Sequence, residues 1–378
     1  MSEDTTVDVP EIRIAPDATT VLQELGLLAE LAGSWEGDGF NLIARPDFKQ
    51  KTNLFLQLND THEQLKVDPI GSPIPNRGFG QKDIRLFGLT YLQKISDRTS
   101  GSALHIEPGI WIKQPDTTYP PEAAPAGQDL IARMGTIPHG NSLLAQGTAA
   151  KFTGDPVLTI PNAQYNGSVF PSFNSTPFPV PPPPALPTLN AAGSSEALSA
   201  PTPPGPPGFT QYDLSIPASP TNTRTNPVPE GVTQDVLNDP ILLLQQVITK
   251  QKADGHSFSG VVLNISTQAK INFFKNKNSK PTDPINTVAV PNGAGGIENI
   301  LFLEGGDPVG AVGANAETAL VYATFWIEKV THPAKPAFMQ LQYAQMVILN
   351  FQILAALPKT ANIGWPHISV ATLKKSFS

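Results

Sequence analysis

Several stretches of this chain alternate apolar and polar residues, and no other property of the sequence limits its fold as strongly. From Leu54 to Leu58 every second residue is a leucine, and the stretch from Glu63 to Asp68 alternates in the same way. Alternation with a period of two places one set of side chains on each face of an extended strand. Further strand-like runs occupy 84–95, 103–113, 130–135, 143–147, 259–266, 319–330, 338–351 and 368–373. They predict a mainly β protein in which antiparallel strands close into a barrel.

Residues 171–229 differ in composition from the strands on either side. They contain 17 of the 40 prolines of the chain, together with runs of Ala, Ser and Gly. A segment of this composition buries too little apolar surface to offset its ordering entropy as a separate domain. Strand-like runs occur both before and after it, so we interpret it as an insertion into one barrel domain that spans residues 21–378. Aromatic residues at its edges favour a strap packed against the barrel, and a flexible linker is the alternative.

Two short helices are expected beside the strands. Four leucines recur at three-residue spacing between residues 21 and 32, which indicates an amphipathic helix that plugs or flanks the barrel. A second helix is predicted over 239–252, where Asp239 suits the N-cap and Pro240 the first helical position. Residues 1–20 are polar and acidic, and we expect them to form an N-terminal arm.

The composition narrows the classes of function. The net charge is −7, the sequence pI is about 5.4 and there is no basic block, which argues against nucleic acid and anionic membranes as partners. The chain has no cysteine, so disulfides, thiolate catalysis and iron–sulfur clusters are excluded. No apolar signal region follows Met1, and no apolar run is long enough to span a membrane. We therefore expect a cytoplasmic protein.

One histidine is placed where it could bind a metal or haem iron. His367 follows Pro366 at the head of the last strand-like run, and a neutral imidazole is the commonest protein ligand for such a metal. On an extended strand Ser369 and Ala371 share its face, and these small residues leave room for a flat group. The alternative is a buried, hydrogen-bonded histidine that closes a sheet.

The other five histidines are weaker candidates. None pairs with another at His-x-His or His-x-x-x-His spacing, so a compact zinc site is not expected. His105 and His139 stand in or beside predicted strands, where a side chain can point inward. His62, His256 and His332 lie in loop-like sequence, which predicts surface positions. There is no P-loop and no Gly-x-Ser-x-Gly motif.

Three short motifs follow one another along the chain: Gly33-Ser34-Trp35-Glu36-Gly37-Asp38-Gly39, His105-Ile106-Glu107-Pro108-Gly109 and Trp365-Pro366-His367. In the same order they resemble the Gly-Thr-Trp-x-Gly-x-Gly opening strand, the internal His-x-Glu-x-Gly strand and the C-terminal Pro-His segment of the nitrobindins. These are small haem-binding β-barrels related to fatty-acid-binding proteins.

The resemblance implies a calycin-like barrel that binds haem b, with His367 as the proximal iron ligand. It implies a distal histidine at His105 or, as second choice, His139. The other residues expected at the cofactor are Trp35, Trp365, Ser369 and Ala371. Small ligands such as NO, peroxynitrite or peroxide would meet the iron, and an enzyme of this kind would be peroxidase-like or peroxynitrite-isomerase-like.

Two other classes of function stay open. The first is a barrel without haem that carries a fatty acid or another apolar small molecule, as the related fatty-acid-binding proteins do. The second is an interaction module that binds a protein partner through the proline-rich segment.

Overall fold

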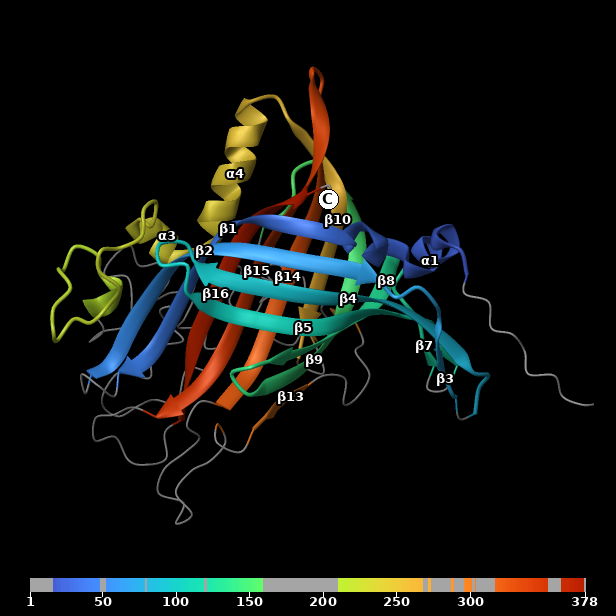
Figure 1. Ribbon diagram of the computed structural model, residues 1–378, viewed down its shortest axis with the longest axis horizontal. Coiled ribbons are helices and arrows are strands. Elements are labelled where there is room, and N and C mark those ends of the chain that lie inside the picture. Colours follow the sequence, from blue (N-terminus) through green and yellow to red (C-terminus); the bar gives the residue numbers. More distant parts are fainter. Residues whose placement is uncertain are drawn as a thin grey trace, which may run out of the picture.

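A ring of ten antiparallel strands dominates the computed structural model, which describes residues 16–47, 52–78, 80–118, 121–158, 210–267, 271–272, 287–288, 296–300, 303, 317–352 and 362–376 (Figure 1). The strands of the ring are β1 (Gly33–Asp47), β2 (Thr52–Pro69), β4 (Ile84–Asp97), β5 (Ala103–Gln114), β8 (Gln128–Ile137), β9 (Asn141–Thr153), β10 (Ser257–Ser266), β14 (Glu317–His332), β15 (Lys335–Gln352) and β16 (Asn362–Ser376). Shorter strands outside the ring are β3 (Ile74–Asn76), β6 (Thr117–Thr118), β7 (Pro121–Glu122), β11 (Ile271–Asn272), β12 (Thr287–Val288) and β13 (Gly296–Asn299).

The ring is closed, because each of its strands is hydrogen-bonded to two neighbours. Strands β1, β2, β4, β5, β8 and β9 pair in chain order, and so do β10, β14, β15 and β16. Two further antiparallel pairings join these halves: β9 with β10, where Gly147 faces Ile265, and β1 with β16, where Ile43 faces His367. In Figure 1, β2, β4 and β5 cross in front of β14, β15 and β16. This arrangement confirms the predicted mainly β fold, a single antiparallel barrel.

Alternation along the strands separates an interior face from an exterior one. All ten strands of the ring contribute odd-numbered residues, such as Trp35 and Phe325, to one buried cluster. Even-numbered strand residues, such as Phe40 and Val370, form a second cluster on the outside. A period of two that is kept around the ring means that odd-numbered strand residues point into the barrel.

The N-terminal helix covers one end of this interior. α1 (Ala18–Leu25) continues into the 3-10 helix η1 (Gly26–Leu31), and Asp17 Oδ1 accepts the N-cap hydrogen bond from Thr20 N at 2.8 Å. Leu25 and Leu31 belong to the interior cluster, and Trp35 Nε1 donates to the Leu31 carbonyl at 2.8 Å. The predicted amphipathic helix is therefore present, and it begins at Ala18 rather than at residue 21.

Two helices pack on the outside of the barrel: α3 (Gln234–Asn238) and α4 (Ile241–Ala253). Leu244 and Ile248 of α4 are buried in the exterior cluster, which attaches the helix to the sheet. Pro240 takes the N-cap position that the sequence assigned to Asp239, while Asp239 Oδ1 still accepts a hydrogen bond from Ile241 N at 3.2 Å. The helix predicted over 239–252 is thus displaced by two residues at its start.

The described end of the predicted insertion runs along β2. It begins with the 3-10 helix η4 (Thr210–Tyr212). Leu56 N donates to the Thr223 carbonyl at 3.1 Å, and Thr225 N donates to the Leu56 carbonyl at 3.0 Å. Arg224 Nη1 donates to the Asp213 carbonyl at 2.9 Å and holds the segment together. Residues 1–15 of the expected arm and residues 159–209 of the insertion and its approach lie outside the described residues.

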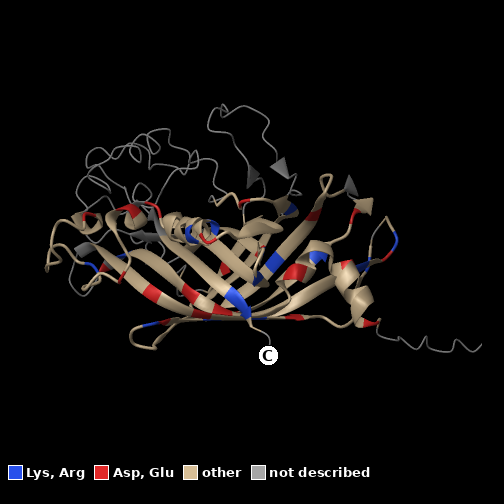
Figure 2. Cartoon of the chain, turned by 90° about the horizontal axis from the view of Figure 1, so that it is seen from above, with Lys and Arg blue, Asp and Glu red and all other residues tan. Residues whose placement is uncertain are grey.

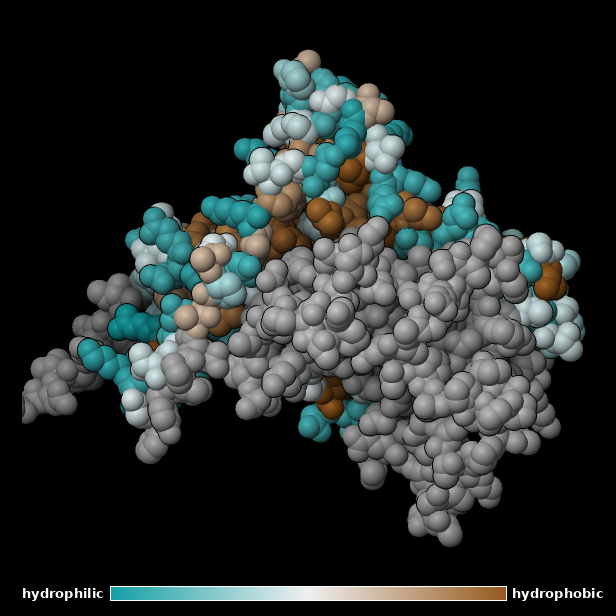
Figure 3. Space-filling view, turned by 180° about the vertical axis from the view of Figure 1, so that it is seen from behind, coloured by the Kyte–Doolittle hydropathy of each residue, from teal (hydrophilic) through white to brown (hydrophobic). Residues whose placement is uncertain are grey.

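The surface of the described part carries both signs of charge. Figure 2 shows acidic and basic residues interspersed along the strands and helices. Seen from behind, hydrophilic residues predominate on the part that projects at the top, and hydrophobic residues gather at its base (Figure 3). No helix within the described ranges is long and apolar enough to cross a membrane.

Candidate functional site

A network of charged and polar side chains crosses the apolar interior of the barrel. Arg133 on β8 donates from Nη2 to Glu107 Oε1 on β5 at 2.7 Å and from Nε to Tyr91 Oη on β4 at 3.0 Å. Tyr91 Oη in turn donates to Glu107 Oε1. Arg133 Nη1 donates to Gln345 Oε1 on β15 at 2.9 Å, so the network links the two halves of the ring.

The electrostatics of this network favour the ionised form of the Arg133–Glu107 pair. Burial opposes ionisation of Glu107, but the Arg133 charge and hydrogen bonds from His105 and Tyr91 outweigh it and lower the pKa of Glu107 to about 2. Burial also opposes the charge of Arg133, and Glu107 more than compensates, which raises the pKa of Arg133. The guanidinium carbon lies 5.3 to 5.7 Å from the centres of three aromatic rings, a range in which ring faces attract a cation.

A second carboxyl group is buried in the same interior. Glu63 Oε2 on β2 accepts hydrogen bonds from Tyr343 Oη at 2.6 Å and from Gln93 Nε2 at 3.3 Å. Glu63 Oε1 accepts from Thr61 Oγ1 at 3.2 Å. Burial raises the pKa of Glu63, and these hydrogen bonds offset the rise only in part. The interior therefore holds one carboxylate, Glu107, that stays ionised and one carboxyl, Glu63, that takes up a proton more readily. Pairs of carboxyl groups whose pKa values differ in this way can divide the roles of base and acid.

His105 lies two residues before Glu107 on the same face of β5. Its Nε2 is 3.3 Å from Glu107 Oε2, and an ionised carboxylate can only accept, so His105 donates from Nε2. In the neutral ring the lone pair then lies on Nδ1, which makes no further hydrogen bond among the described residues. The side chain is 20% exposed. His105 can therefore accept a proton at Nδ1 from a molecule that enters the barrel.

His139 is the neighbour of His105. It lies in the exposed turn between β8 and β9, and the centres of the two rings are 6.0 Å apart. Partial burial of the ring lowers the pKa of His139, and the charge that His105 can carry lowers it further. The structure thus brings together the two histidines expected on the distal side.

His367 stands on β16 between Ile43 of β1 and Val347 of β15. The residue is half-buried, but its Nε2 is inaccessible and has no hydrogen-bond partner in the described part of the chain. Burial lowers the pKa of His367 to about 3, the charge of His139 lowers it as well, and a hydrogen bond with the Ala44 backbone opposes the fall. The imidazole is therefore neutral at neutral pH and has one unpaired nitrogen, the form in which histidine binds a metal.

Small side chains follow His367 along the interior face of β16. Ser369 Oγ accepts a hydrogen bond from Asn41 Nδ2 at 2.7 Å, and Ala371 is 1% exposed. Gly39 faces Ala371 across the β1–β16 pair, and a Cβ atom on Gly39 would lie 2.8 Å from the Ala371 Cβ. The close approach of the two strands therefore requires glycine here.

The structure does not bring Trp35 to His367. Trp35 is buried at the α1 end of the barrel, eight residues along β1 from Ile43, the residue that faces His367. Eight residues of extended strand span about 26 Å. Trp365 lies in β16 and faces Leu349, and its side chain is outside the description.

Arg133, Glu63 and Tyr343 are interior residues that the sequence analysis did not identify. A signal for them was present, because each occupies an inward position two residues from a buried apolar residue of the interior cluster: Ile131 for Arg133, Leu65 for Glu63 and Leu341 for Tyr343. A polar residue at such a position must find partners inside the barrel.

The surface prediction was incomplete for His62, His256 and His332, which are half-buried. His62 lies within strand β2 rather than in a loop, and its two ring nitrogens are each 3.1 Å from a carboxylate oxygen, on Glu36 and Asp38. The rings of His256 and His332 have centres 4.9 Å apart.

Within the described residues no group of three or more His, Asp or Glu side chains is arranged to hold a bare metal ion.

Comparisons with known proteins place few limits on this site. No family model matches the chain, and no curated protein matches it. Among solved structures, the chain is similar to the crystal structure of Rv2717c from M. tuberculosis, with a TM-score of 0.32 and 12% identity over 97% of this chain and 100% of that one. A likeness this weak identifies no family.

Proposed function

We propose that this protein binds haem b within the barrel, with His367 as the protein ligand to the iron. The observation that carries the proposal is the inaccessible Nε2 of a neutral His367, which has no hydrogen-bond partner among the described residues. A buried polar atom without a partner is unfavourable, and an iron at that nitrogen would satisfy it. The hydrogen bond with the Ala44 backbone fixes the orientation of the ring, as ligand histidines require.

Residues beside His367 fit a flat cofactor. Ser369 and Ala371 are small, and they lie on the same interior face. When bound, the haem would supply an iron that holds NO, peroxynitrite or peroxide. His367 would contribute the ligand nitrogen and Ser369 a short polar contact near it.

His105 would act on the exogenous ligand. Glu107 holds its Nε2, and Arg133 and Tyr91 hold Glu107, so His105 offers a lone pair at Nδ1. A protic ligand such as a peroxide could transfer its proton to this nitrogen, and the imidazolium that forms would be stabilised by Glu107. His139, 6.0 Å away between ring centres, is the second group of the same kind.

The test is a haemin titration followed in the Soret region. His367→Ala should abolish or strongly weaken haem binding, because it removes the protein ligand to the iron. His105→Ala should leave haem bound and alter peroxide reactivity. His256→Ala is a matched control, since its Nδ1 lies 3.1 Å from the Gln251 carbonyl on the outside of the barrel.

A wild-type protein without a Soret shift would overturn the haem proposal. If that protein took up a fatty acid instead, the chain would be a carrier of apolar molecules.

A further inference from the structure

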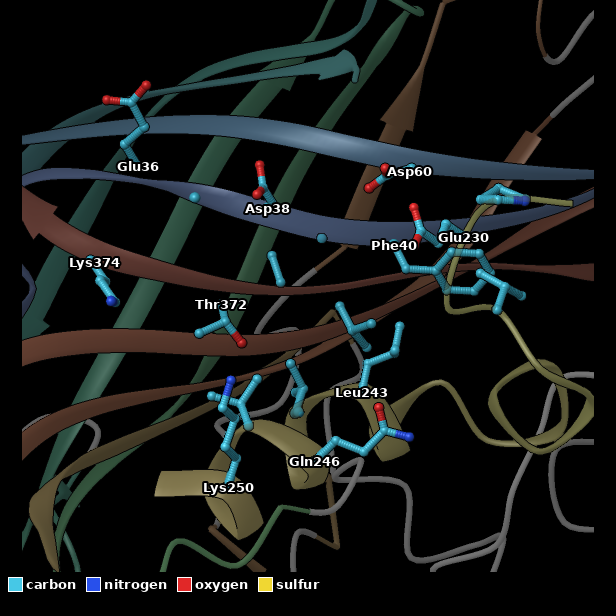
Figure 4. Close-up of a pocket in the computed structure, with 18 residues that line it drawn as sticks. Glu36, Asp38, Phe40, Asp60, Glu230, Leu243, Gln246, Lys250, Thr372 and Lys374 are labelled. Carbon is cyan, nitrogen blue, oxygen red and sulfur yellow. The ribbon is translucent and has the colours of Figure 1, made fainter. Parts of the chain in front are cut away.

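A groove with a volume of about 590 Å³ lies on the outside of the barrel, between β1, β2, β16 and helix α4 (Figure 4). Residues of the 229–232 segment complete its lining. The volume falls in the range of small-molecule sites. The groove lies on the opposite face of β16 from His367, because three of its four lining residues on that strand, Val370, Thr372 and Lys374, are even-numbered.

Part of the groove lining is apolar. Phe40 and Val370 belong to the exterior cluster and are almost fully buried. Leu243 and Val247 of α4 are half-buried and line the groove from the helix side. They remain partly accessible, whereas Leu244 and Ile248 of the same helix are buried against the sheet. An apolar ligand body could therefore cover side chains that water now reaches.

One end of the groove has an excess of carboxylates. In Figure 4, Asp60 and Glu230 lie with Phe40 at one end, while Lys250 and Lys374 lie away from them. Burial raises the pKa of Asp60, Arg98 opposes the rise, and the charges of Asp38, Asp97 and Glu230 add to it. The negative potential from three neighbouring carboxylates thus reaches Asp60.

The protein's own cations do not neutralise this end. Arg98 Nη1 is shared between Asp38 Oδ2 at 3.7 Å and Asp60 Oδ2 at 3.6 Å. The ring nitrogens of His62 on β2 are occupied by Glu36 and Asp38 on the neighbouring strand β1. Within the described residues Glu230 has no ion pair.

We propose that the groove binds a small amphipathic molecule with an organic ammonium group, whose apolar part covers Leu243 and Val247 and whose cation lies beside Asp60 and Glu230. The carboxylates of Asp60 and Glu230 favour a cationic group, and the apolar lining of the groove favours an apolar remainder of the ligand. This site is separate from the proposed haem site and does not depend on it.

Isothermal titration calorimetry with octylamine, which is protonated at pH 7, tests the proposal against octanoate, an anion of the same length. Octylamine should bind at least about tenfold more tightly than octanoate. Glu230→Gln should weaken octylamine binding about fivefold. Glu230 is exposed, so the substitution leaves the fold intact. Asp83→Asn is the matched control, because Asp83 is exposed and pairs with Arg77 outside the groove.

Haemin titration of the protein saturated with octylamine locates the amine. An unchanged haemin titration supports the groove, whereas competition between the two ligands would place octylamine inside the barrel and overturn the proposal. Equal affinity for octanoate, or an unaffected Glu230→Gln variant, would also overturn it. If the protein binds no haem but still binds octylamine more tightly than octanoate, the proposed amine site in the groove is retained and only the haem proposal is overturned.

Discussion

Arg133 and Glu107 form an ion pair that is almost completely removed from water. The side chain of Arg133 is 2% exposed and that of Glu107 is 0% exposed. Both Glu107 oxygens are occupied, Oε1 by Arg133 and Tyr91 and Oε2 by His105. A buried ion pair of this kind adds little net stability over an apolar pair. Removal of one partner, however, leaves the other charge buried without a counter-ion.

Glu107→Gln should therefore destabilise the protein at pH 7 by about 3 to 5 kcal/mol, because it leaves the Arg133 charge without its counter-ion. Urea denaturation measures the loss. The double variant Glu107→Gln/Arg133→Met should recover a large part of it, and a double variant as unstable as Glu107→Gln would contradict the role of the pair.

The pH dependence of this difference follows from the direction of the pKa shift. The folded-state pKa of Glu107 is lowered from 4.5 to about 2, so its contribution is present above about pH 4.5 and is lost as the pH falls toward 2. The gap in stability between wild type and Glu107→Gln should close over that window. A gap that stays constant down to pH 2 would show that folding does not lower the pKa of Glu107.

Part of this site could be predicted from single positions. His105 and Glu107 are two residues apart on a strand, so their contact follows from alternation alone. Arg133 is 26 residues away from Glu107, and their contact depends on the order in which β5 and β8 pair. The unpaired nitrogen of His367 likewise depends on which strands flank β16, and the sequence motif carries no sign of it.

The pairing of β9 with β10 closes the barrel across the insertion. Residues 259–266 pair with 153–146, and Gly147 lies opposite Ile265. A Cβ atom on Gly147 would lie 1.8 Å from the backbone oxygen of Asn264, far inside any normal contact. The strands can approach this closely only because position 147 lacks a side chain.

Gly147→Ala should lower the free energy of unfolding by about 2 to 4 kcal/mol, because the two backbones must separate at the closing pair. Thermal and urea unfolding measure the effect. Gly71→Ala is the control, since no atom of the described residues lies within 4 Å of a Cβ at that position, and it should change stability by less than about 0.5 kcal/mol. Equal effects of the two substitutions would show that the closing pair is not tight.

The strands were easier to predict than their ends. The run 368–373 lies inside β16, which extends from Asn362 to Ser376, and 338–351 lies inside β15, from Lys335 to Gln352. Apolar alternation marks only the part of a strand that is buried on one face. The ends are extended because backbone hydrogen bonds to neighbouring strands continue past the apolar part, and those partners are not visible in a local stretch of sequence.

The barrel is assembled from two parts of the chain that meet twice. Residues 33–153 supply six strands and residues 257–376 supply four, and the two parts pair along β9–β10 and along β1–β16. Both pairings, and the Arg133–Gln345 hydrogen bond inside, hold the parts together without the connecting segment.

Limited proteolysis between residues 180 and 210 should therefore leave two fragments that stay associated. Size-exclusion chromatography under native conditions should give one peak that contains both fragments, and urea should separate them. A strap packed against the barrel should also slow the cleavage. Two fragments that elute separately without denaturant would mean that the parts are independent domains.

The two joining pairs also bear on how the protein is made. A ribosome releases residues 33–153 well before residues 257–376, and until then β1 lacks β16, and β9 lacks β10 and β13. Unpaired strand edges readily add a strand from another chain, and the long connection delays the segment that belongs there. The nascent protein thus passes through a stage in which a six-stranded curved sheet has two unpaired edge strands, β1 and β9. Pairing with β16 and β10 closes these edges, so the sheet can no longer pair with other nascent chains on the same polysome.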